Sequence, residues 1–280
     1  MPRRVMHSVD QHYGRSGLGS AIAQALRLAG KDGRPLTPIE LAPLDHFHSR
    51  GRDATLELAA LAEPGADTEV LDVGGGLGGP ARTLAHEIGC RVTVLDLTEE
   101  FCRIGRDLAR RTGLEKRVVF EHGDALAMPF PEGAFDLAWT QHSSMNIDDK
   151  ERLYGEVHRV LRQKGRLAIH EIMAGPGGSL HFPVPWARDP AISFLRRPDA
   201  IRALVAALGF REIVWRDETE LTLAWMRERL AAQAAQVAGP PPPLGLHLLF
   251  GAETPTILGN FERNLAERRV AVVKAVWERA

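Results

Sequence analysis

Short apolar runs alternate with helical patterns along the middle of the chain. The apolar runs are rich in β-branched residues and predict strands at 69–73, 91–96, 118–123, 135–140 and 166–172. Between them, the spacing of apolar residues predicts helices at 79–88, 99–113 and 148–163. We expect Gly165 to cap the last of these helices in a left-handed conformation. Strands that alternate with helices are typical of βαβ units, so the pattern predicts an α/β fold around a mostly parallel sheet.

The two ends of the chain depart from this alternating order. Before the first strand, the pattern predicts helices at 18–30 and 53–62, with the stretch "LDHFHSRGRD" in a loop between them. After the fifth strand it predicts a helix at 198–208 and two more strands, within "REIVWRDE" and "RRVAVVKAVWER". The proline-rich stretch "GPPPPLGL" at 239–246 is too rigid for a helix, so we expect a loop or a lid hinge there.

Length and charge narrow the class of partner. The 280 residues can bury a full core and fit one large domain, or one domain with a lid. Because 35 basic residues nearly cancel 36 acidic ones, no overall field favours nucleic acid or an anionic membrane, and a small molecule is the expected partner. Two cysteines without CxxC spacing, no long apolar run and an N-terminus without a signal-peptide core together predict a cytoplasmic protein.

The turn after the first predicted strand, in "EVLDVGGGLGGP", is rich in glycine. Such a turn lets the backbone approach a ligand closely and points the free amides of the next helix at it. Gly74, Gly76 and Gly79 fit the dinucleotide fingerprint G-x-G-x-x-G, while Gly74, Gly76 and Gly78 equally fit a G-x-G-x-G turn. Asp96, which ends the second strand, suits a ribose diol in either case. Spacing alone therefore leaves the ligand open, and a merely tight corner remains an alternative.

Three further features favour one ligand class over a dinucleotide. Asp72 places a carboxylate beside the turn, where it would repel a pyrophosphate but attract an ammonium group. Asp124 can accept a hydrogen bond from an exocyclic amine, and the amide of Ala125 can serve a ring nitrogen, so the pair can bind an adenine edge. The Tyr-x-x-x-Lys pair of short-chain dehydrogenases is missing, because His158 stands four residues after Tyr154.

With these residues in view, the sequence resembles the class I S-adenosylmethionine-dependent methyltransferases over about residues 45–175. The resemblance rests on "LDVGGGLGG", "VLDLT", "GDALAMPFPEGAFD" and "HRVLRQKGRLAIHEI", in that order. The subgroup that it resembles holds sarcosine/dimethylglycine N-methyltransferases, quinone-biosynthesis C-methyltransferases and natural-product O-methyltransferases. It implies a Rossmann-like sheet of seven strands, with the last strand antiparallel in a hairpin from the tail and helices on both faces.

The resemblance also implies an organisation of the chain. We expect a single methyltransferase domain over 1–280, with a helical cap over 1–62, a cofactor-binding core over 63–175, and lid segments and C-terminal strands over 176–280. A homodimer is a possible assembly of this chain.

The same resemblance implies roles in binding S-adenosylmethionine. Asp72 and the turn of Gly74, Gly76 and Gly78 would hold its amino acid part. Asp96 would bind the ribose, Leu97 would lie against the adenine, and Asp124 with Ala125 would bind the base edge. Gln141 and Tyr13 complete the expected set, with Tyr13 folding across the cofactor. The alternative for Asp124 is an aspartate that caps its own turn, and for Tyr13 a surface aromatic.

The acceptor is expected beyond the carboxyl ends of the fourth and fifth strands. These ends bring Gln141, His142, Ser143, Asn146, His170 and Glu171 toward the site. Many relatives carry a histidine where this chain has Asn146, which leaves His142 as the first candidate general base; a contact to the cofactor or a loop is its alternative. Because His170 and Glu171 alternate in direction, we expect only one of them to face the pocket. Further candidate substrate contacts are Asn146, His181, Trp186 and His247.

The histidines also raise a metal alternative. "HFH" at 46–48 pairs two imidazoles, and His12, His181 and His247 could join them from loops. No HExxH, CxxC or compact acid cluster accompanies them, so we predict no metal and regard them as loop histidines. Apolar residues in "HFPVPWARDPAISFL" and "PPPPLGLHLLFG" predict a lid that excludes water, although packing of the tail on the sheet accounts for part of them.

Together these features predict an S-adenosylmethionine-dependent methyltransferase that acts on a small molecule and releases S-adenosylhomocysteine. An apolar lid with histidine and amide contacts favours O- or C-methylation of a metabolite. A compact amine such as sarcosine or dimethylglycine would favour an aromatic cage or an acid pair, so N-methylation is the alternative. A nicotinamide-dependent oxidoreductase and a cofactor-binding protein without turnover are alternatives from other classes.

Overall fold

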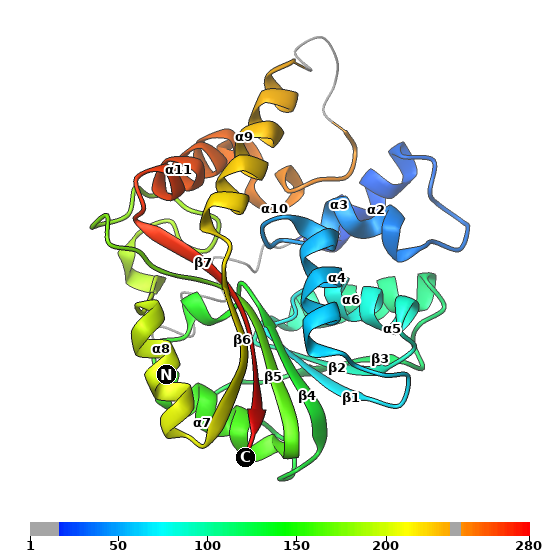
Figure 1. The fold of residues 1–280 in the computed structure, drawn as a ribbon. Coiled ribbons are helices and arrows are strands. Elements are labelled where there is room, and N and C mark those ends of the chain that lie inside the picture. The colour runs from blue at the N-terminus through cyan, green and yellow to red at the C-terminus, as the bar shows by residue number, and fades with distance from the viewer. Residues whose placement is uncertain (1–16, 236–241) are drawn as a thin grey trace.

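A seven-stranded sheet forms the centre of the computed structural model, which describes residues 17–235 and 242–280 (Figure 1). The strands lie in the order β3-β2-β1-β4-β5-β7-β6. Their bounds are β1 Glu69–Val73, β2 Arg91–Asp96, β3 Val118–His122, β4 Phe135–Gln141, β5 Leu161–Ala174, β6 Phe210–Asp217 and β7 Val270–Arg279. Neighbouring strands from β1 to β5 are parallel, whereas β7 pairs antiparallel with both β5 and β6. The predicted sheet, with its antiparallel last strand from a tail hairpin, is confirmed.

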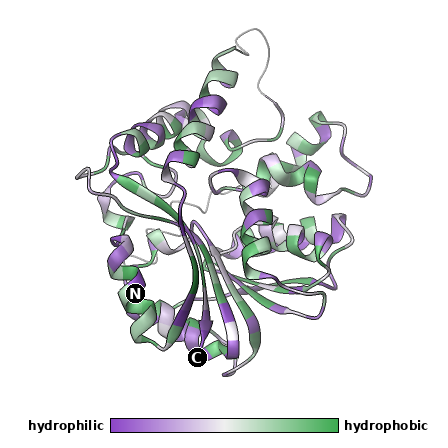
Figure 2. Ribbon diagram, viewed as in Figure 1, coloured by the Kyte–Doolittle hydropathy of each residue, from purple (hydrophilic) through white to green (hydrophobic). Residues whose placement is uncertain are grey.

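Helices cover both faces of the sheet, as expected (Figure 1). On one face, α4 (Gly51–Ala62), α5 (Gly79–Glu87) and α6 (Glu99–Arg111) bury residues such as Leu58, Leu84 and Cys102 against the strands. On the other face, α7 (Lys150–Val160) and α8 (Pro198–Ala207) bury Tyr154 and Val205. Because both faces are covered, hydrophobic residues run along the central strands instead of strictly alternating with polar ones (Figure 2).

The N-terminal segment contains a helix that the sequence analysis assigned to a loop. Besides α2 (Leu18–Leu28), the structure has α3 (Pro38–Asp45), which ends inside the stretch "LDHFHSRGRD". Thr37 and Glu40 form a reciprocal capping box at its start, and Pro38 occupies the first helical position. The pattern T-P-x-E was therefore a signal for this helix in the sequence.

The prediction that Gly165 caps a helix is wrong. Helix α7 begins with Asp149 as its N-cap but ends at Val160, and β5 begins at the next residue. Gly165 lies inside β5 at an irregular pairing with β4, where a Cβ would come 2.8 Å from the carbonyl oxygen of Arg162. The left-handed residue is its neighbour Lys164. The glycine thus allows a close backbone approach at a bulge.

The tail adds helices above the carboxyl ends of the strands. These are α9 (Thr219–Ala235), α10 (His247–Phe250) and α11 (Thr254–Ala266) (Figure 1), with the short turns η2 (Pro190–Ile192) and η3 (Gly251–Glu253). A third short turn, η1 (Ser144–Asn146), follows β4. The predicted loop at 239–246 lies partly outside the described residues. In the two described stretches, no helix combines the length and apolar character needed to cross a membrane.

A buried ion pair between α3 and α5 holds the N-terminal helices against the glycine-rich turn. Arg82 on α5 donates to Asp45, at the end of α3, over 2.5 Å, and to the carbonyl oxygen of Leu77 over 2.7 Å. Both charged side chains are almost completely buried. Gly79 makes this docking possible, because a Cβ there would collide with the backbone of Asp45. The segment that follows Asp45 is thereby held over the strand ends.

Candidate functional site

A pocket lies at the carboxyl ends of four neighbouring strands. The loops that follow β1, β2, β3 and β4 line its floor, the segment after α3 lines one side, and the tail contributes two short stretches. The lining residues are Asp45, Phe47, His48, Asp72, Gly74–Gly76, Pro80, Leu95–Thr98, Phe101, Gly123–Ala125, Gln141–Ser143, Met145–Ile147, Pro185, Trp186, Leu249 and Phe250. This is the position at which open α/β sheets bind their ligands.

The glycine turn brings the backbone close to the pocket. Gly74 has φ of 70°, and a Cβ on it would lie 2.5 Å from that of Ser143. A Cβ on Gly75 would lie 2.5 Å from a carboxylate oxygen of Asp72. The turn therefore needs glycine at these positions both for its conformation and to leave room for the aspartate.

Asp72 is a buried carboxyl group with an oxygen that has no partner. Its side chain is 1% exposed, and Oδ2 accepts no hydrogen bond in the structure. Burial, together with the nearby carboxylate of Asp96, raises the pKa of Asp72 to about 8. A buried carboxyl group without a full set of partners is costly, and Asp72 lines the pocket, so the arrangement fits a ligand that places a cationic group beside it.

Asp96 joins the turn to the end of β2. Its Oδ2 accepts from the backbone N–H of Gly76 over 2.8 Å, and its Oδ1 accepts from that of Thr98 over 2.9 Å. Burial raises its pKa despite these bonds. Asp96 and the adjacent Leu97 both line the pocket. The carboxylate therefore shapes the turn and also faces the ligand space.

The expected adenine contacts lie side by side in the loop after β3. Asp124 and Ala125 both line the pocket. At the same time, Oδ1 of Asp124 accepts from the backbone N–H of Leu126 over 2.9 Å. One carboxylate oxygen thus caps its own turn, which is the alternative function considered from the sequence, and this cap fixes the side chain at the edge of the pocket.

Several sequence-predicted residues lie outside the pocket. Gly78 forms the N-cap of α5, and a Cβ on it would point at Phe120. Glu171 accepts from the backbone N–H groups of Ser143 and Ser144, so it holds the loop after β4. His170 is fully buried beneath that loop. The expectation that either His170 or Glu171 faces the pocket is therefore corrected: both are buried, because the covered strand has no open face.

Of the other predicted substrate contacts, some line the pocket and some do not. His181 pairs with Glu267 over 2.8 Å and, like His247 at the start of α10, does not line the pocket. Trp186 and Asn146 do line it, and the amide of Asn146 donates to the carbonyl oxygens of Trp186 and Ile192. Asn146 therefore ties the lid segment to the strand end. Tyr13 falls outside the described residues.

His142 lines the pocket as a neutral imidazole. It is a left-handed residue with φ of 50°, and its Nε2 lies 3.2 Å from Oγ of Ser49. Burial lowers the pKa of His142 to about 3, so the ring is neutral at physiological pH. Next to it stands His48, a pocket residue that the sequence analysis considered only as half of a metal pair. Among the described residues, no group of metal-ligating side chains is arranged to hold an ion.

Comparison with known proteins identifies the core of the chain. Residues 71–169 match the family model described as a methyltransferase domain. A glycine/sarcosine/dimethylglycine N-methyltransferase from Actinopolyspora halophila is 32% identical over 178 residues, which are 64% of this chain and 32% of that protein. The chain spans about a third to about half of the length of the curated relatives that it matches.

Solved structures share the whole fold at lower identity. Geranyl diphosphate methyltransferase in complex with geranyl diphosphate and sinefungin has a TM-score of 0.71 and 19% identity, over 99% of this chain and 100% of that one. The [4+2]-cyclase SpnF has a TM-score of 0.64 and 24% identity, over 81% and 80%. These likenesses establish the fold. Residues 71–169 therefore match a methyltransferase domain, and the chain shares the Rossmann-like fold of these solved structures.

Proposed function

We propose that the protein transfers a methyl group from S-adenosylmethionine to a small molecule. The observation that carries this proposal is the buried, unpaired Oδ2 of Asp72 beside the glycine turn. The methionine part of S-adenosylmethionine brings an ammonium group, which would lie beside Asp72 in the pocket and favour the ionised form of this buried carboxyl group. A dinucleotide would instead bring a pyrophosphate, which offers no cation to this buried carboxyl group and would be repelled by it once it ionises.

The remaining proposed contacts to the cofactor come from the ends of β2, β3 and β4. Asp96 would accept from the ribose hydroxyls, Leu97 would pack on the adenine, and Asp124 with Ala125 would bind its edge. Gln141 lines the pocket and is held by Trp139 and Thr55, so it would fix the wall near the reacting end. When bound, the cofactor supplies an activated methyl group, and the protein contributes mainly positioning and the exclusion of water.

The pocket favours O- or C-methylation of an apolar metabolite. Its lining includes the apolar side chains of Met145, Ile147, Trp186 and Phe250, with His48 and His142 among the polar groups. No arginine or lysine lies among the lining residues that the structure describes. A substrate with a carboxylate or phosphate would therefore lack a cationic partner in that part of the chain.

N-methylation of a small amine is the alternative, and the named relative that methylates glycine, sarcosine and dimethylglycine favours it. The likeness to a cyclase shows that the fold alone does not determine the reaction. A nicotinamide-dependent oxidoreductase and a binding protein without turnover remain the alternatives from other classes. We also propose one domain over 1–280, because a single apolar cluster joins α2, α3, α6 and the loop before α10.

Methyl transfer with a mixed panel of acceptors tests the proposal. The protein is incubated with S-adenosylmethionine and either a phenol, a 1,3-diketone, sarcosine or dimethylglycine, and S-adenosylhomocysteine is quantified. We expect product that depends on the oxygen or carbon acceptor. Product that depends on sarcosine or dimethylglycine would establish the amine alternative, and binding without turnover on any acceptor would favour a binding protein.

Asp96→Ala is expected to weaken cofactor affinity by on the order of 2 kcal/mol, because a charged acceptor for the ribose hydroxyls is lost. The same change also removes the acceptor of the Gly76 and Thr98 amides, so we expect a lower melting temperature. Calorimetric titration and thermal unfolding measure the two effects separately. Unchanged affinity in a folded variant would remove the ribose assignment.

A further inference from the structure

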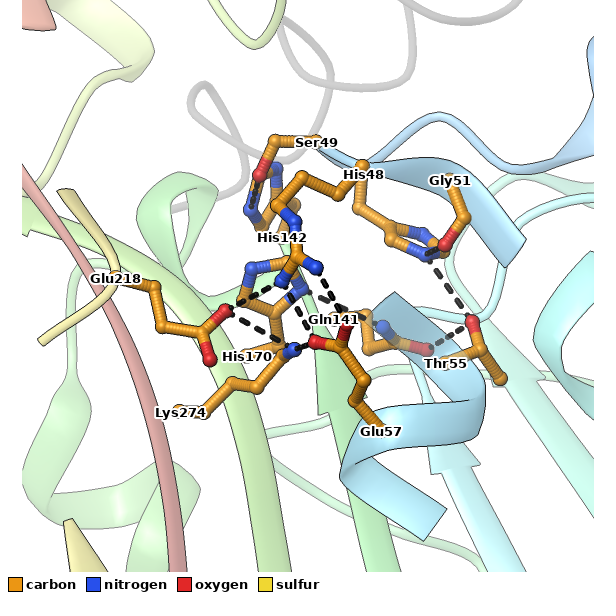
Figure 3. A network of polar contacts seen from close by, with 11 residues as sticks. His48, Ser49, Gly51, Thr55, Glu57, Gln141, His142, His170, Glu218 and Lys274 are labelled. Atoms are coloured by element: carbon orange, nitrogen blue, oxygen red, sulfur yellow. Dashed lines mark hydrogen bonds and ion pairs between the residues drawn. The ribbon is translucent and has the colours of Figure 1, made fainter. Parts of the chain in front are cut away.

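Three imidazoles lie together at the junction of the cap and the strand ends (Figure 3). The ring centroids of His142 and His170 are 4.8 Å apart, and those of His48 are 5.8 Å from His170 and 6.1 Å from His142. His48 and His142 line the pocket, whereas His170 lies behind them. His48 follows α3 and comes from the cap, so it reaches the pocket from the side opposite to the sheet.

A chain of hydrogen bonds determines which nitrogen of His48 carries the proton. The indole N–H of Trp139 donates to Oε1 of Gln141 over 2.9 Å, and an indole is only a donor. Thr55 Oγ1 donates to the same oxygen over 3.0 Å, which uses its only hydrogen. Nε2 of His48 lies 3.1 Å from Thr55 Oγ1 and 2.9 Å from the carbonyl oxygen of Gly51, which can only accept. Nε2 of His48 is therefore the protonated nitrogen.

The other nitrogen of His48 consequently carries a lone pair. Burial is the main cause that lowers the pKa of His48 well below its ordinary value, with His46, His142 and Lys274 adding to it, so the ring is neutral at physiological pH. Nδ1 has no hydrogen-bond partner among the described residues, and the residue as a whole is 5% exposed. Since His48 lines the pocket, this lone pair is open to a ligand there.

Neither of the other two imidazoles offers such a defined acceptor. Nε2 of His142 faces Oγ of Ser49, and a hydroxyl either donates or accepts, so its tautomer is not determined. His170 is fully buried, and its Nδ1 lies 3.5 Å from the Gln141 amide nitrogen. Its Nε2 has no partner and is closed to solvent. Only His48 combines a determined tautomer with an open nitrogen in the pocket.

Ion pairs behind the cluster hold the backbone that orients His48. Arg50 contacts Glu57 and Glu218, and Lys274 contacts the same two carboxylates (Figure 3). Lys274 is fully buried on β7, while Glu57 lies on α4 six residues, or nearly two turns, after Gly51. The network therefore ties the first turn of α4, with the carbonyl of Gly51 and the hydroxyl of Thr55, to the sheet.

We propose that Nδ1 of His48 removes the proton from an acceptor hydroxyl, which makes an alcohol or phenol the substrate class. This inference rests on the proposed methyl transfer. As the acceptor oxygen forms its bond to the methyl carbon, the methyl–sulfur bond breaks and sulfur keeps the electron pair. The hydroxyl proton passes to Nδ1, giving an imidazolium that later releases the proton to water. The sulfonium charge disappears as the imidazolium charge forms, so the net charge of the site is unchanged.

Two matched naphthols test this role through the ionisation of the acceptor. The probes are 1-naphthol, which needs a base, and 4-nitro-1-naphthol, which is already ionised at mildly alkaline pH. We expect His48→Gln to slow single-turnover transfer to 1-naphthol by about 10²–10⁴-fold and to slow transfer to the nitro compound far less. The affinity of the same variant for S-adenosylmethionine is expected to stay within a few-fold of the wild-type value. His142→Gln is the matched control and is expected to slow both acceptors by the same factor.

Other outcomes overturn the inference. Equal slowing of both naphthols by His48→Gln would mean that His48 only positions the site, and selective slowing by His142→Gln would move the role to that residue. A wild-type protein that binds S-adenosylmethionine but methylates neither naphthol would contradict the hydroxyl class alone, whereas failure to bind it would contradict the proposed function. Nitrogen-15 spectra of the wild-type imidazoles give a test without variants: we expect a neutral His48 protonated on Nε2, and the opposite tautomer would overturn the proposal.

Discussion

Replacing Asp72 by asparagine is expected to abolish measurable S-adenosylmethionine binding while it stabilises the empty protein. The carboxylate would be a buried charged partner of the ligand ammonium group at the glycine turn, so its loss should cost about 100-fold in affinity. The same carboxylate is buried with an unpaired oxygen. An amide of the same shape removes that buried acid, so function and stability should change in opposite directions.

The pKa of Asp72 gives this prediction a pH dependence. Because burial raises the pKa from 3.8 to about 8, the folded protein holds a proton that the unfolded chain releases. The contribution of Asp72 to stability is therefore fully present below the unfolded value and is lost as pH rises toward 8. We expect the free energy of unfolding of Asp72→Asn to exceed that of the wild type by several kcal/mol near pH 8, and by little near pH 4.

Ligand binding should show the opposite trend with pH. The ammonium group binds the ionised carboxylate, so wild-type affinity should rise about tenfold per pH unit below about pH 8, with release of a proton. Equilibrium dialysis and urea unfolding across this range measure the two trends. Asp107→Asn, an exposed aspartate on α6, is the matched control and should change neither. Affinity that is independent of pH, or a variant that binds normally, would contradict the role of Asp72.

Arg82→Met is expected to cost about 3–5 kcal/mol of unfolding free energy, the largest loss of stability that we predict. The substitution keeps most of the side-chain volume but leaves Asp45 buried without its main cationic partner. Because Asp45 joins the cap to the pocket wall, the cap should loosen from the glycine turn before the sheet unfolds. S-adenosylmethionine affinity should fall together with stability.

A surface ion pair of the same length provides the control. Arg110 and Asp107 are also 2.5 Å apart, but both are largely exposed. Arg110→Met should therefore cost less than about 1 kcal/mol. Urea unfolding of both variants, and of the double variant Arg82→Met with Asp45→Asn, gives the coupling energy. Equal costs for Arg82→Met and Arg110→Met would mean that the cap is not anchored through this pair.

The sequence predicts well the elements whose signal is local. The five central strands lie close to their predicted ranges, because a strand covered on both faces is a short apolar run between turns. Asp72 and Asp96 lie at the carboxyl ends of two such strands and Asp124 follows a third, so the parallel sheet brings them into one pocket. The helix predicted to end at 163 extends into what is β5 in the structure. Glycine often ends a helix, but Gly165 lies in a bulge of this strand instead.

The part of the site formed by the N-terminal segment depends on contacts between residues far apart in the sequence, which a local sequence pattern cannot predict. His48 and Asp45 enter the pocket only because α3 docks on α5 through Arg82 and Gly79. The alternation rule for His170 and Glu171 also failed as a guide, because it describes directions along a strand but not which faces are covered. The tautomer of His48 cannot be predicted from the sequence, because it depends on the hydrogen bonds that Trp139 and Thr55 donate to Gln141 in the folded protein.

Parallel calorimetric titrations of the purified protein with S-adenosylmethionine, S-adenosylhomocysteine and reduced nicotinamide dinucleotides test the central claim most directly. The site described here predicts saturable binding of the first two, with one proton released per ligand near pH 7, and no binding of the dinucleotides. Binding of a dinucleotide without either adenosyl ligand would contradict the assignment of Asp72 as an ammonium site and, with it, the proposed methyl transfer.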